Sequence, residues 1–315
     1  MPANQTTNQL LMVRPANFAR GSATVADNEF QHRPATRHYA EIAAAARREF
    51  DGFVNLLRGA GVRVLVVEDT ATPVKPDAVF PNNWFTTHED GLLVTYPYYY
   101  PQRRAERRRD ILDLLDANFV INRTLSLEHW EEEDRFLEGT GCLILDRANR
   151  VAYACLSQRC TRSAVHDCCA ALEYRPITFT ATDAAGTPIY HTNVIMALGT
   201  AAAIVCLESV PDPAERAILT DALALGGRRI VDISREQVAR FAGNALELTT
   251  PQGPLWVMST AAREALRPDQ LDTLLAPPGM RLLHADLPNI EHFGGGSARC
   301  MMAEIFLPPK TVTLP

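Results

Sequence analysis

Residues 139–156 read GTGCLILDRANRVAYACL, two short apolar runs separated by a polar turn. The apolar run 142–145 leads into the turn 146–150, and the run 151–156 returns, which predicts a β-hairpin. Residues 163–172 follow with helical spacing, and residues 175–179 have the composition of a third strand. The segment therefore predicts a unit with the order strand, strand, helix, strand.

A similar unit occurs five times along the chain. The equivalent first residues are Asn83, Gly141, Asn193, Asn244 and Arg299, with spacings of 51 to 58 residues. A repeat of about fifty residues indicates units that stack or close around an axis. Because none of the units resembles a polar cap, we predict an α/β fold in which five ββαβ units form a propeller, as one domain over residues 1–315.

The last unit stops after one strand, so its remaining elements must come from the N-terminus. We expect the strand 10–13, the helix 36–57 and the strand 62–67 to complete it. The other predicted strands are 84–87, 92–96, 119–121, 194–198, 202–207, 229–233, 245–248, 255–258 and 280–284, and the other predicted helices are 105–115, 213–225 and 260–275. Closure of this kind places the first residues of all units at one end of the ring.

Composition narrows the class of protein. With 315 residues, 47% of them hydrophobic, the chain can bury a core without needing disulfides or a structural metal. No run approaches the roughly 18 apolar residues of a membrane span, and the N-terminus lacks a signal-peptide core, so we expect a cytoplasmic protein. The seven cysteines form no CxxC pair or zinc spacing, which argues against a disulfide framework and a structural metal. A formal charge of −6 argues against nucleic acid as a partner.

Three consecutive glycines, residues 294–296, precede Cys300 near the end of the chain. Glycines allow positive φ angles and a close approach to a ligand, and they place one cysteine at the start of a short apolar strand. A thiol attacks only as the thiolate, which Arg299 and nearby backbone N–H groups favour. A buried structural cysteine is the alternative for this segment taken alone.

The predicted ring brings polar side chains of several units together. A cysteine, a histidine and a carboxylate supply a nucleophile, a proton carrier and a group that orients substrate or imidazole. His191 could instead be a core histidine, and Glu138 could cap a strand. Their equivalent positions in the repeat favour catalysis. The side chains near these positions are those of Asp77, Asn83, Glu138, His191, Asn193 and Cys300.

Three motifs carry a resemblance to a known superfamily. Glu138-Gly139-Thr140-Gly141, His191-Thr192-Asn193 and the glycine-rich segment before Cys300 resemble the guanidino-group-modifying enzymes, or penteins. The nearest group is the citrulline-utilisation hydrolases related to arginine deiminases. Residues 76–80 and 156–159 also resemble the dimethylarginine hydrolases. The resemblance implies a five-bladed propeller with a central site and no metal or organic cofactor.

The resemblance also implies roles for single residues. Cys300 would attack the central carbon of a guanidino or ureido group, His191 would protonate the leaving amine and later activate water, and Glu138 would accept hydrogen bonds from substrate nitrogen.

Three further residues would hold the substrate. Asp77 would bind it, and Arg103 and Arg159 would clamp its α-carboxylate, a geometry that arginine suits. The rest of the basic run 103–109 is interleaved with acidic residues and is typical of a solvated helix.

Two positions depart from the arginine deiminases, which carry aspartate where this chain has Asn83 and Asn193. A buried guanidinium depends on paired carboxylates, so these changes favour a less cationic substrate. We therefore expect a cysteine hydrolase of citrulline-like ureido amino acids that could also start from arginine.

Two alternatives stay open. One is an arginine deiminase or dimethylarginine hydrolase in which Asp77 and Glu138 alone neutralise the guanidinium. The other is a catalytically silent propeller that binds an arginine-like metabolite. The expected partner is a small molecule, with neither nucleic acid nor membrane, and the sequence leaves open whether the protein forms a homo-oligomer.

Overall fold

The computed structural model describes residues 3–33 and 38–310. These residues form five three-stranded sheets, and four of them are built from consecutive strands. In each of these four, an antiparallel hairpin is followed by a strand parallel to its second strand. The four sheets are β3 (Phe85–Thr87), β4 (Leu92–Thr95) and β5 (Arg123–Ser126); β6 (Ile144–Asp146), β7 (Val151–Cys155) and β8 (Arg175–Phe179); β9 (Met196–Leu198), β10 (Ala202–Val205) and β11 (Arg229–Asp232); and β12 (Leu246–Thr250), β13 (Gly253–Ser259) and β14 (Arg281–Ala285).

The fifth sheet joins the two ends of the chain. Its middle strand β1 (Gln9–Arg14) pairs antiparallel with β15 (Ala303–Glu304) and parallel with β2 (Arg63–Glu68). Leu10 lies opposite Glu304 in this pairing. The sheet therefore has the same pattern as the other four, with its hairpin made from segments about three hundred residues apart.

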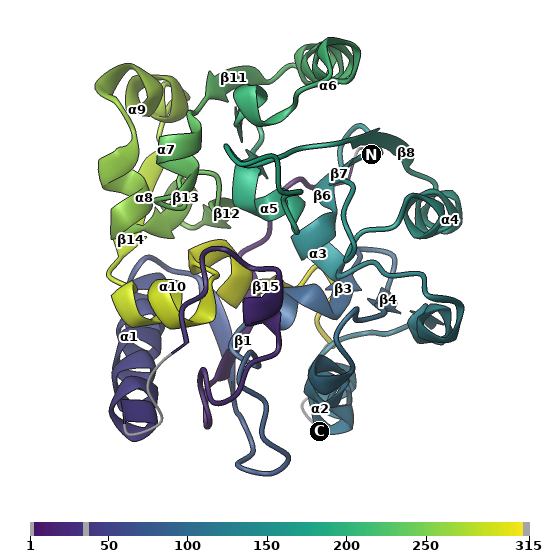
Figure 1. Cartoon of the computed structure of the whole chain (residues 1–315), viewed down its shortest axis with the longest axis vertical. Coiled ribbons are helices and arrows are strands. Elements are labelled where there is room, and N and C mark those ends of the chain that lie inside the picture. The colour runs from purple at the N-terminus through teal and green to yellow at the C-terminus, as the bar shows by residue number, and fades with distance from the viewer. Residues whose placement is uncertain (1–2, 34–37, 311–315) are drawn as a thin grey trace.

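Helices connect the second and third strands of the sheets. They are α1 (Tyr39–Gly59), α2 (Arg109–Asn118), α4 (Arg162–Leu172), α6 (Pro213–Leu225), and the pair α8 (Thr260–Ala265) and α9 (Pro268–Leu275). Figure 1 shows α1, α2, α4, α6 and α9 at the periphery and the short helices α3 and α5 nearer the middle. None of the helices in the described part is both long and apolar enough to cross a membrane.

Helix α1 illustrates how the helices are held. Ile42, Phe50, Phe53 and Leu57 recur at helical spacing and are buried against Leu10 of β1 and its neighbours. Each fully buried side chain of this size contributes roughly 1.5–3 kcal/mol. The predicted start of this helix at Thr36 lies outside the described residues.

The predicted strand 119–121 is wrong. The third strand of its unit is β5 (Arg123–Ser126), which pairs with β4 although its side chains are mostly exposed. Phe119 is buried at the end of α2 and forms an isolated bridge with Pro309. The prediction relied on apolar side chains, but this edge strand has mostly exposed side chains and is held by its backbone hydrogen bonds.

Two predicted strands begin too early, and one predicted helix is interrupted. The segments before β6 and β9 form the one-turn helices α3 (Gly139–Cys142) and α5 (Thr192–Ile195). Short buried helices and strands have the same apolar composition, so periodicity does not separate them. The predicted helix 260–275 breaks before Pro268, which lacks the N–H that a helix interior requires. The short helices α7 (Arg235–Val238) and α10 (Pro288–Gly294) were not predicted.

Gly139 allows α3 to lie against the turn Pro81–Asn83. Its φ angle is +46°, and a Cβ atom there would come within 2.5 Å of the Asn82 carbonyl oxygen. A side chain at this position would therefore face both a strained backbone and a contact with main chain that cannot rotate away.

We predict that Gly139→Ala destabilises the protein by about 1–3 kcal/mol and lowers activity, because it pushes the segment 82–83 away from α3. The measurement is denaturant unfolding of the purified variant. Gly52→Ala is the control: Gly52 lies inside α1 with no atom within 4 Å of its Cβ position, so alanine should leave stability unchanged or raise it. Equal stability of the two variants would contradict the account.

Candidate active site

A cavity of about 20 Å³ collects the residues that the sequence singled out. Its lining includes Asp77, Asn83, Arg103, Arg159, His191 and Cys300. Glu138 and Asn193 lie directly behind this lining, where they contact His191 and Cys300 respectively. The structure thus brings all eight predicted site residues together. A cavity of this size has room for little more than one water molecule, which needs roughly 10–15 Å³, so a substrate enters only if part of the wall moves.

Glu138 and His191 form a buried ion pair at the centre of the site. They precede α3 and α5, and His191 Nε2 lies 2.8 Å from Glu138 Oε2. Burial opposes ionisation of Glu138, but the hydrogen bond to His191 and the charges of Arg159 and Arg103 lower its pKa to about 2. Burial also opposes ionisation of His191, but its contacts with Cys142 and Glu138 raise its pKa above the usual 6.5. The two pKa shifts therefore favour a carboxylate on Glu138 and an imidazolium on His191.

Gly141 lets the imidazole approach the second repeat unit. A Cβ atom at this position would lie 2.8 Å from both the His191 ring and the Asn83 carboxamide. The spacing of the motif Glu138-Gly139-Thr140-Gly141 thus reflects close packing of three units.

Cys142, the other cysteine near the site, has a structural environment. Its side chain is fully buried, and its sulfur accepts a hydrogen bond from Glu138 N–H and donates to the Arg159 carbonyl. Burial opposes ionisation, yet contacts with Cys160 and His191 hold its pKa below the usual range. Cys300 lines the cavity and Cys142 does not.

Cys300 lies in the 3-10 turn Ala298–Met301, after α10 and the glycines. Gly295 has a φ angle of +62°, as the glycine run predicted, and ends α10. Asn244 Nδ2 lies 3.2 Å and Asn193 Nδ2 3.5 Å from Cys300 Sγ. Burial raises the pKa of Cys300, and hydrogen bonds from Asn244 and Asn193 and the charge of Arg299 only partly oppose this rise. Cys300 therefore rests as a thiol.

Asn244 was not among the predicted site residues. Besides contacting the sulfur, it donates to the Asn193 carbonyl at 2.9 Å and accepts from Arg299 N–H at 3.0 Å. The signal was present in the sequence, because Asn244 and Asn193 occupy equivalent positions of the repeat.

Asn83 and Asn193, the asparagines that stand where arginine deiminases carry aspartate, differ in their surroundings. With its amide oriented to satisfy its neighbours, Asn83 donates to Asn82 Oδ1 at 2.9 Å and accepts from Arg103 Nη1 at 2.9 Å. Asn193 Oδ1 is buried and has no hydrogen-bond partner among the described residues. An acceptor left in this way near the sulfur is ready for a substrate N–H.

Both predicted clamp arginines are already occupied by carboxylates. Arg103 binds Glu106 through two hydrogen bonds of 2.9 and 2.7 Å and lies over the Tyr98 ring. Arg159 binds Asp27 in the same two-point manner, with Nε 3.0 Å from Oδ2. Neither pairing could be predicted, since Asp27 lies in a polar loop and Glu106 in a basic run.

Asp77 is a buried carboxylate that only neutral groups bind. Ser22 Oγ donates to it at 2.7 Å, and Thr24 Oγ1 and Gln31 Nε2 lie 3.3 and 3.5 Å away. Within residues 3–33 and 38–310, no Lys, Arg or His side chain forms an ion pair with it. Such a carboxylate attracts a cationic group of a ligand.

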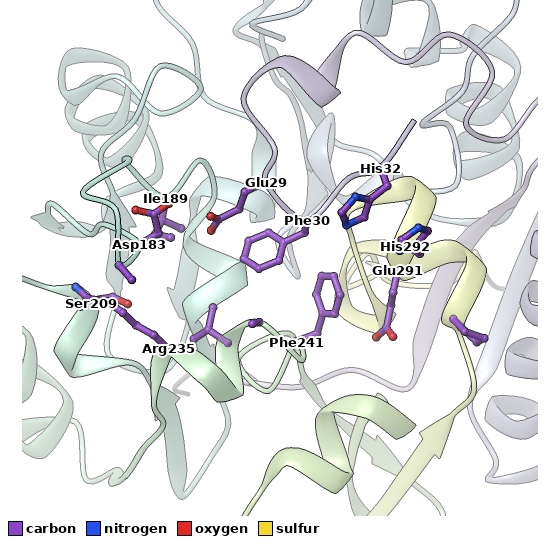
Figure 2. A pocket seen from close by; sticks show the side chains of 14 residues that line it. Glu29, Phe30, His32, Asp183, Ile189, Ser209, Arg235, Phe241, Glu291 and His292 are labelled. Carbon is purple, nitrogen blue, oxygen red and sulfur yellow. The ribbon is translucent and has the colours of Figure 1, made fainter. Parts of the chain in front are cut away.

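The loop that supplies these donors also covers the cavity. Asn28 Nδ2 donates to the Gly295 carbonyl at 3.1 Å, and Gln31 Nε2 donates to the Phe293 carbonyl at 3.1 Å. A larger cavity of about 590 Å³ borders the same loop through Glu29, Phe30 and His32 (Figure 2). None of the predicted site residues lines this larger cavity. The segment 24–32 therefore borders both the small Cys300 cavity and the larger cavity.

No metal site is evident in the described part of the chain: it holds no group of three or more His, Cys, Asp or Glu side chains placed to bind an ion.

A family model described as "N,N dimethylarginine dimethylhydrolase, eukaryotic" matches residues 14–307. The chain belongs to this family. It is accordingly a hydrolase of non-peptide C–N bonds that acts on guanidino groups, within the superfamily that its motifs resemble. No curated protein matches the chain.

Solved structures of similar fold agree with this assignment. The N-terminal domain of ArgZ, an arginine dihydrolase from the ornithine-ammonia cycle in cyanobacteria, was solved bound to substrate. It has a TM-score of 0.71 and 17% identity over 95% of this chain and 99% of that one. AgrE in complex with L-arginine has a TM-score of 0.73 and 16% identity over 96% of this chain and 41% of its own. A dimethylarginine dimethylaminohydrolase adduct with S-methyl-L-thiocitrulline has a TM-score of 0.65 and 13% identity over 95% and 99%. At these identities the likeness shows the fold alone.

The ion pair makes a prediction about pH. Glu138→Gln removes the carboxylate that helps to raise the pKa of His191, so the imidazolium should lose its proton at lower pH than in the wild type. Histidine titration by NMR measures this directly, with Glu89→Gln, an exposed carboxylate away from His191, as the control. The same His191 pKa in wild type and Glu138→Gln would show that the pair does not govern the proton.

The pair also links stability to pH. His191, with its raised pKa, contributes stability that is present below pH 6.5 and is lost as pH rises through the folded value. Glu138, with its lowered pKa, contributes stability that is present above pH 4.5 and is lost as pH falls toward 2. Both contributions to stability are therefore fully present between pH 4.5 and pH 6.5.

Proposed function

We propose that this hydrolase cleaves C–N bonds at the ureido carbon of citrulline-like amino acids, or carries arginine through that stage, by way of a covalent bond to Cys300. The observation that supports this most is the amide environment of the sulfur. Asn193 and Asn244 both donate to Cys300 Sγ, and Asn193 keeps a free buried acceptor. A neutral ureido group needs both donors and acceptors, whereas an ionised aspartate only accepts.

The architecture that we propose for this activity is a closed ring of five blades in one domain. The pairing of β1 with β15 supports closure, because it uses the chain's two ends to make one sheet of the common pattern. Turns and short helices that begin the units supply residues of the Cys300 cavity, and the long helices lie at the periphery (Figure 1).

The proposed chemistry uses three side chains. Cys300 loses its proton to solvent, and the thiolate, favoured by the two amide donors, attacks the ureido carbon. The C–N bond breaks as the His191 imidazolium gives its proton to the leaving nitrogen. Neutral His191 then takes a proton from water, the hydroxide attacks the same carbon, and the C–S bond breaks. Glu138 holds the imidazole in place and stabilises its charge.

Charge at the substrate's other end supports an amino-acid substrate. Asp77 is suited to an ammonium group, since its present partners are neutral. Arg159 is suited to the α-carboxylate, but Asp27 occupies its guanidinium in this state. Asp27 is partly exposed and lies on the covering loop, whereas Glu106 is buried with Arg103. We infer that the substrate carboxylate displaces Asp27 from Arg159.

A guanidino hydrolase that stops after one step is the second candidate function. The carboxylates of Asp77 and Glu138 favour it, since they could neutralise a guanidinium between them. A silent binding protein is disfavoured by the Cys300, His191 and Glu138 set in one closed site.

We predict that the wild-type enzyme converts citrulline, or carries arginine past citrulline to ornithine. With arginine as the substrate, Asn83→Asp should release more citrulline and less ornithine than the wild type. A carboxylate at position 83 favours a guanidinium and opposes negative charge on a ureido oxygen. The measurement is the ratio of citrulline to ornithine by amino-acid analysis, with citrulline alone as a second substrate. A wild type that releases citrulline as its final product and ignores added citrulline would favour the one-step hydrolase.

We predict that Asp27→Asn lowers KM for arginine or citrulline by roughly tenfold, equivalent to about 1.4 kcal/mol of relieved competition for Arg159. The KM for agmatine, which lacks the α-carboxylate, should fall much less. Asp113→Asn, which removes an exposed carboxylate on α2, serves as the matched control. A parallel change for arginine and agmatine would show that Asp27 does not compete with the carboxylate.

A further inference from the structure

A second polar cavity, of about 400 Å³, lies away from the Cys300 site. The turns of the β3–β4 and β6–β7 hairpins form much of its wall, and its lining includes Asn4, His88, Arg123, Arg147, Arg150 and Tyr174. Strands β3 and β6 run from the segments beside Asn83 and Gly141 to these turns. The cavity therefore lies at the opposite ends of the strands, and no residue lines both sites.

Arg147 is the unusual residue in this wall. Only 5% of it is exposed, and one face of its guanidinium lies 3.7 Å from the centre of the Phe306 ring. Its Nη1 approaches the Thr87 carbonyl at 3.4 Å and His88 Nδ1 at 3.5 Å, which are long contacts. Across the described ranges, no carboxylate pairs with Arg147, and its Nε and Nη2 have no hydrogen-bond partner. A buried cation without a counter-charge is costly, so an anion at this place would be stabilising.

Two more arginines can join it. Arg123 pairs with Asp90 at 2.9 Å and Arg150 with Glu173 at 3.5 Å, and all four side chains are about half exposed or more. Ion pairs this exposed contribute little, so either arginine can turn to a stronger acceptor. The third nearby carboxylate, Glu89, is held by Asn4 Nδ2 at 2.5 Å.

His88 indicates the sign of the local field. Burial lowers its pKa to about 3, and the charges of Arg147, Arg150 and Arg123 lower it further than Asp90 raises it. The imidazole is therefore neutral at physiological pH. At the His88 ring the charges of the three arginines outweigh that of Asp90, although Glu89, Asp90 and Glu173 also line the cavity.

We propose that this cavity binds a small anion that carries two or more negative charges, such as a phosphate monoester or a dicarboxylate. Arg147 would supply the buried charge and two free N–H donors, and Arg123 and Arg150 would close over the anion from the rim. The volume lies within the usual range for small-ligand pockets, about 300–1,000 Å³. Arginine is the side chain best suited to phosphate and carboxylate oxygens.

Calorimetric titration of the full chain at low salt tests the proposal, with inorganic phosphate and succinate as the two probes. The wild type should bind at least one of them. Arg147→Gln should weaken that binding by about tenfold or more, and the exposed double variant Arg123→Gln/Arg150→Gln should weaken it several-fold. Arg229→Gln, an exposed arginine outside the cavity, is the matched control and should bind as the wild type does.

Three results would overturn the proposal: no binding of either probe by the wild type, equal binding by wild type and Arg147→Gln, or protection of Cys300 from iodoacetamide by the bound anion. The last would place the anion at Arg159 instead. Should Arg147→Gln fail to fold, the double variant decides, because its side chains are exposed and an unchanged affinity would be sufficient to reject the site.

Discussion

The buried carboxylate of Glu138 is the constraint on which the site depends. It has no solvent exposure, and four groups from three segments of the chain surround it. His191 Nε2 and the Tyr99 N–H bind it at 2.8 and 3.1 Å, and Arg103 and Arg159 lie 3.7 and 3.8 Å away. A buried charge that loses a partner costs about 3–5 kcal/mol, so the units that carry these partners are held together by one anion. That anion also keeps the imidazole charged and in place for catalysis.

The charges around the cavity support the proposed amino-acid substrate. Asp27, Asp77, Glu106 and Glu138 face Arg103, Arg159 and the His191 imidazolium, so the closed site has an excess of one negative charge. Among these four carboxylates, Asp77 alone has no cationic partner within the described residues. In the proposed complex, the ammonium group of the substrate would restore the balance at Asp77, and its α-carboxylate would replace Asp27 on Arg159. The reacting end would meet the amides of Asn193 and Asn244 at Cys300, beside the charged pair of Glu138 and His191.

The repeat and the motifs predicted much of this site, and packing explains what they missed. Glu138, His191 and Cys300 were selected because each lies beside the first residue of a unit of the repeat, and Asn244 could have been selected by the same argument. Asp27 and Glu106 could not, since a polar loop and a basic run carry no pattern that names a partner. The one-turn helices α3 and α5 looked like strands because both are short and buried. The edge strand β5 was misplaced because its side chains are exposed.

The central claim is that Cys300 forms a covalent bond to the substrate carbon. Rapid acid quenching during turnover of citrulline or arginine, followed by mass spectrometry of the peptide that contains Cys300, tests it directly. The account predicts a carbon adduct on Cys300 in the wild type, none in Cys300→Ala, and turnover by that variant below about one-thousandth of the wild type, an effect of about 4 kcal/mol on the barrier. Turnover that persists in Cys300→Ala, or an adduct found on Cys142, would contradict it.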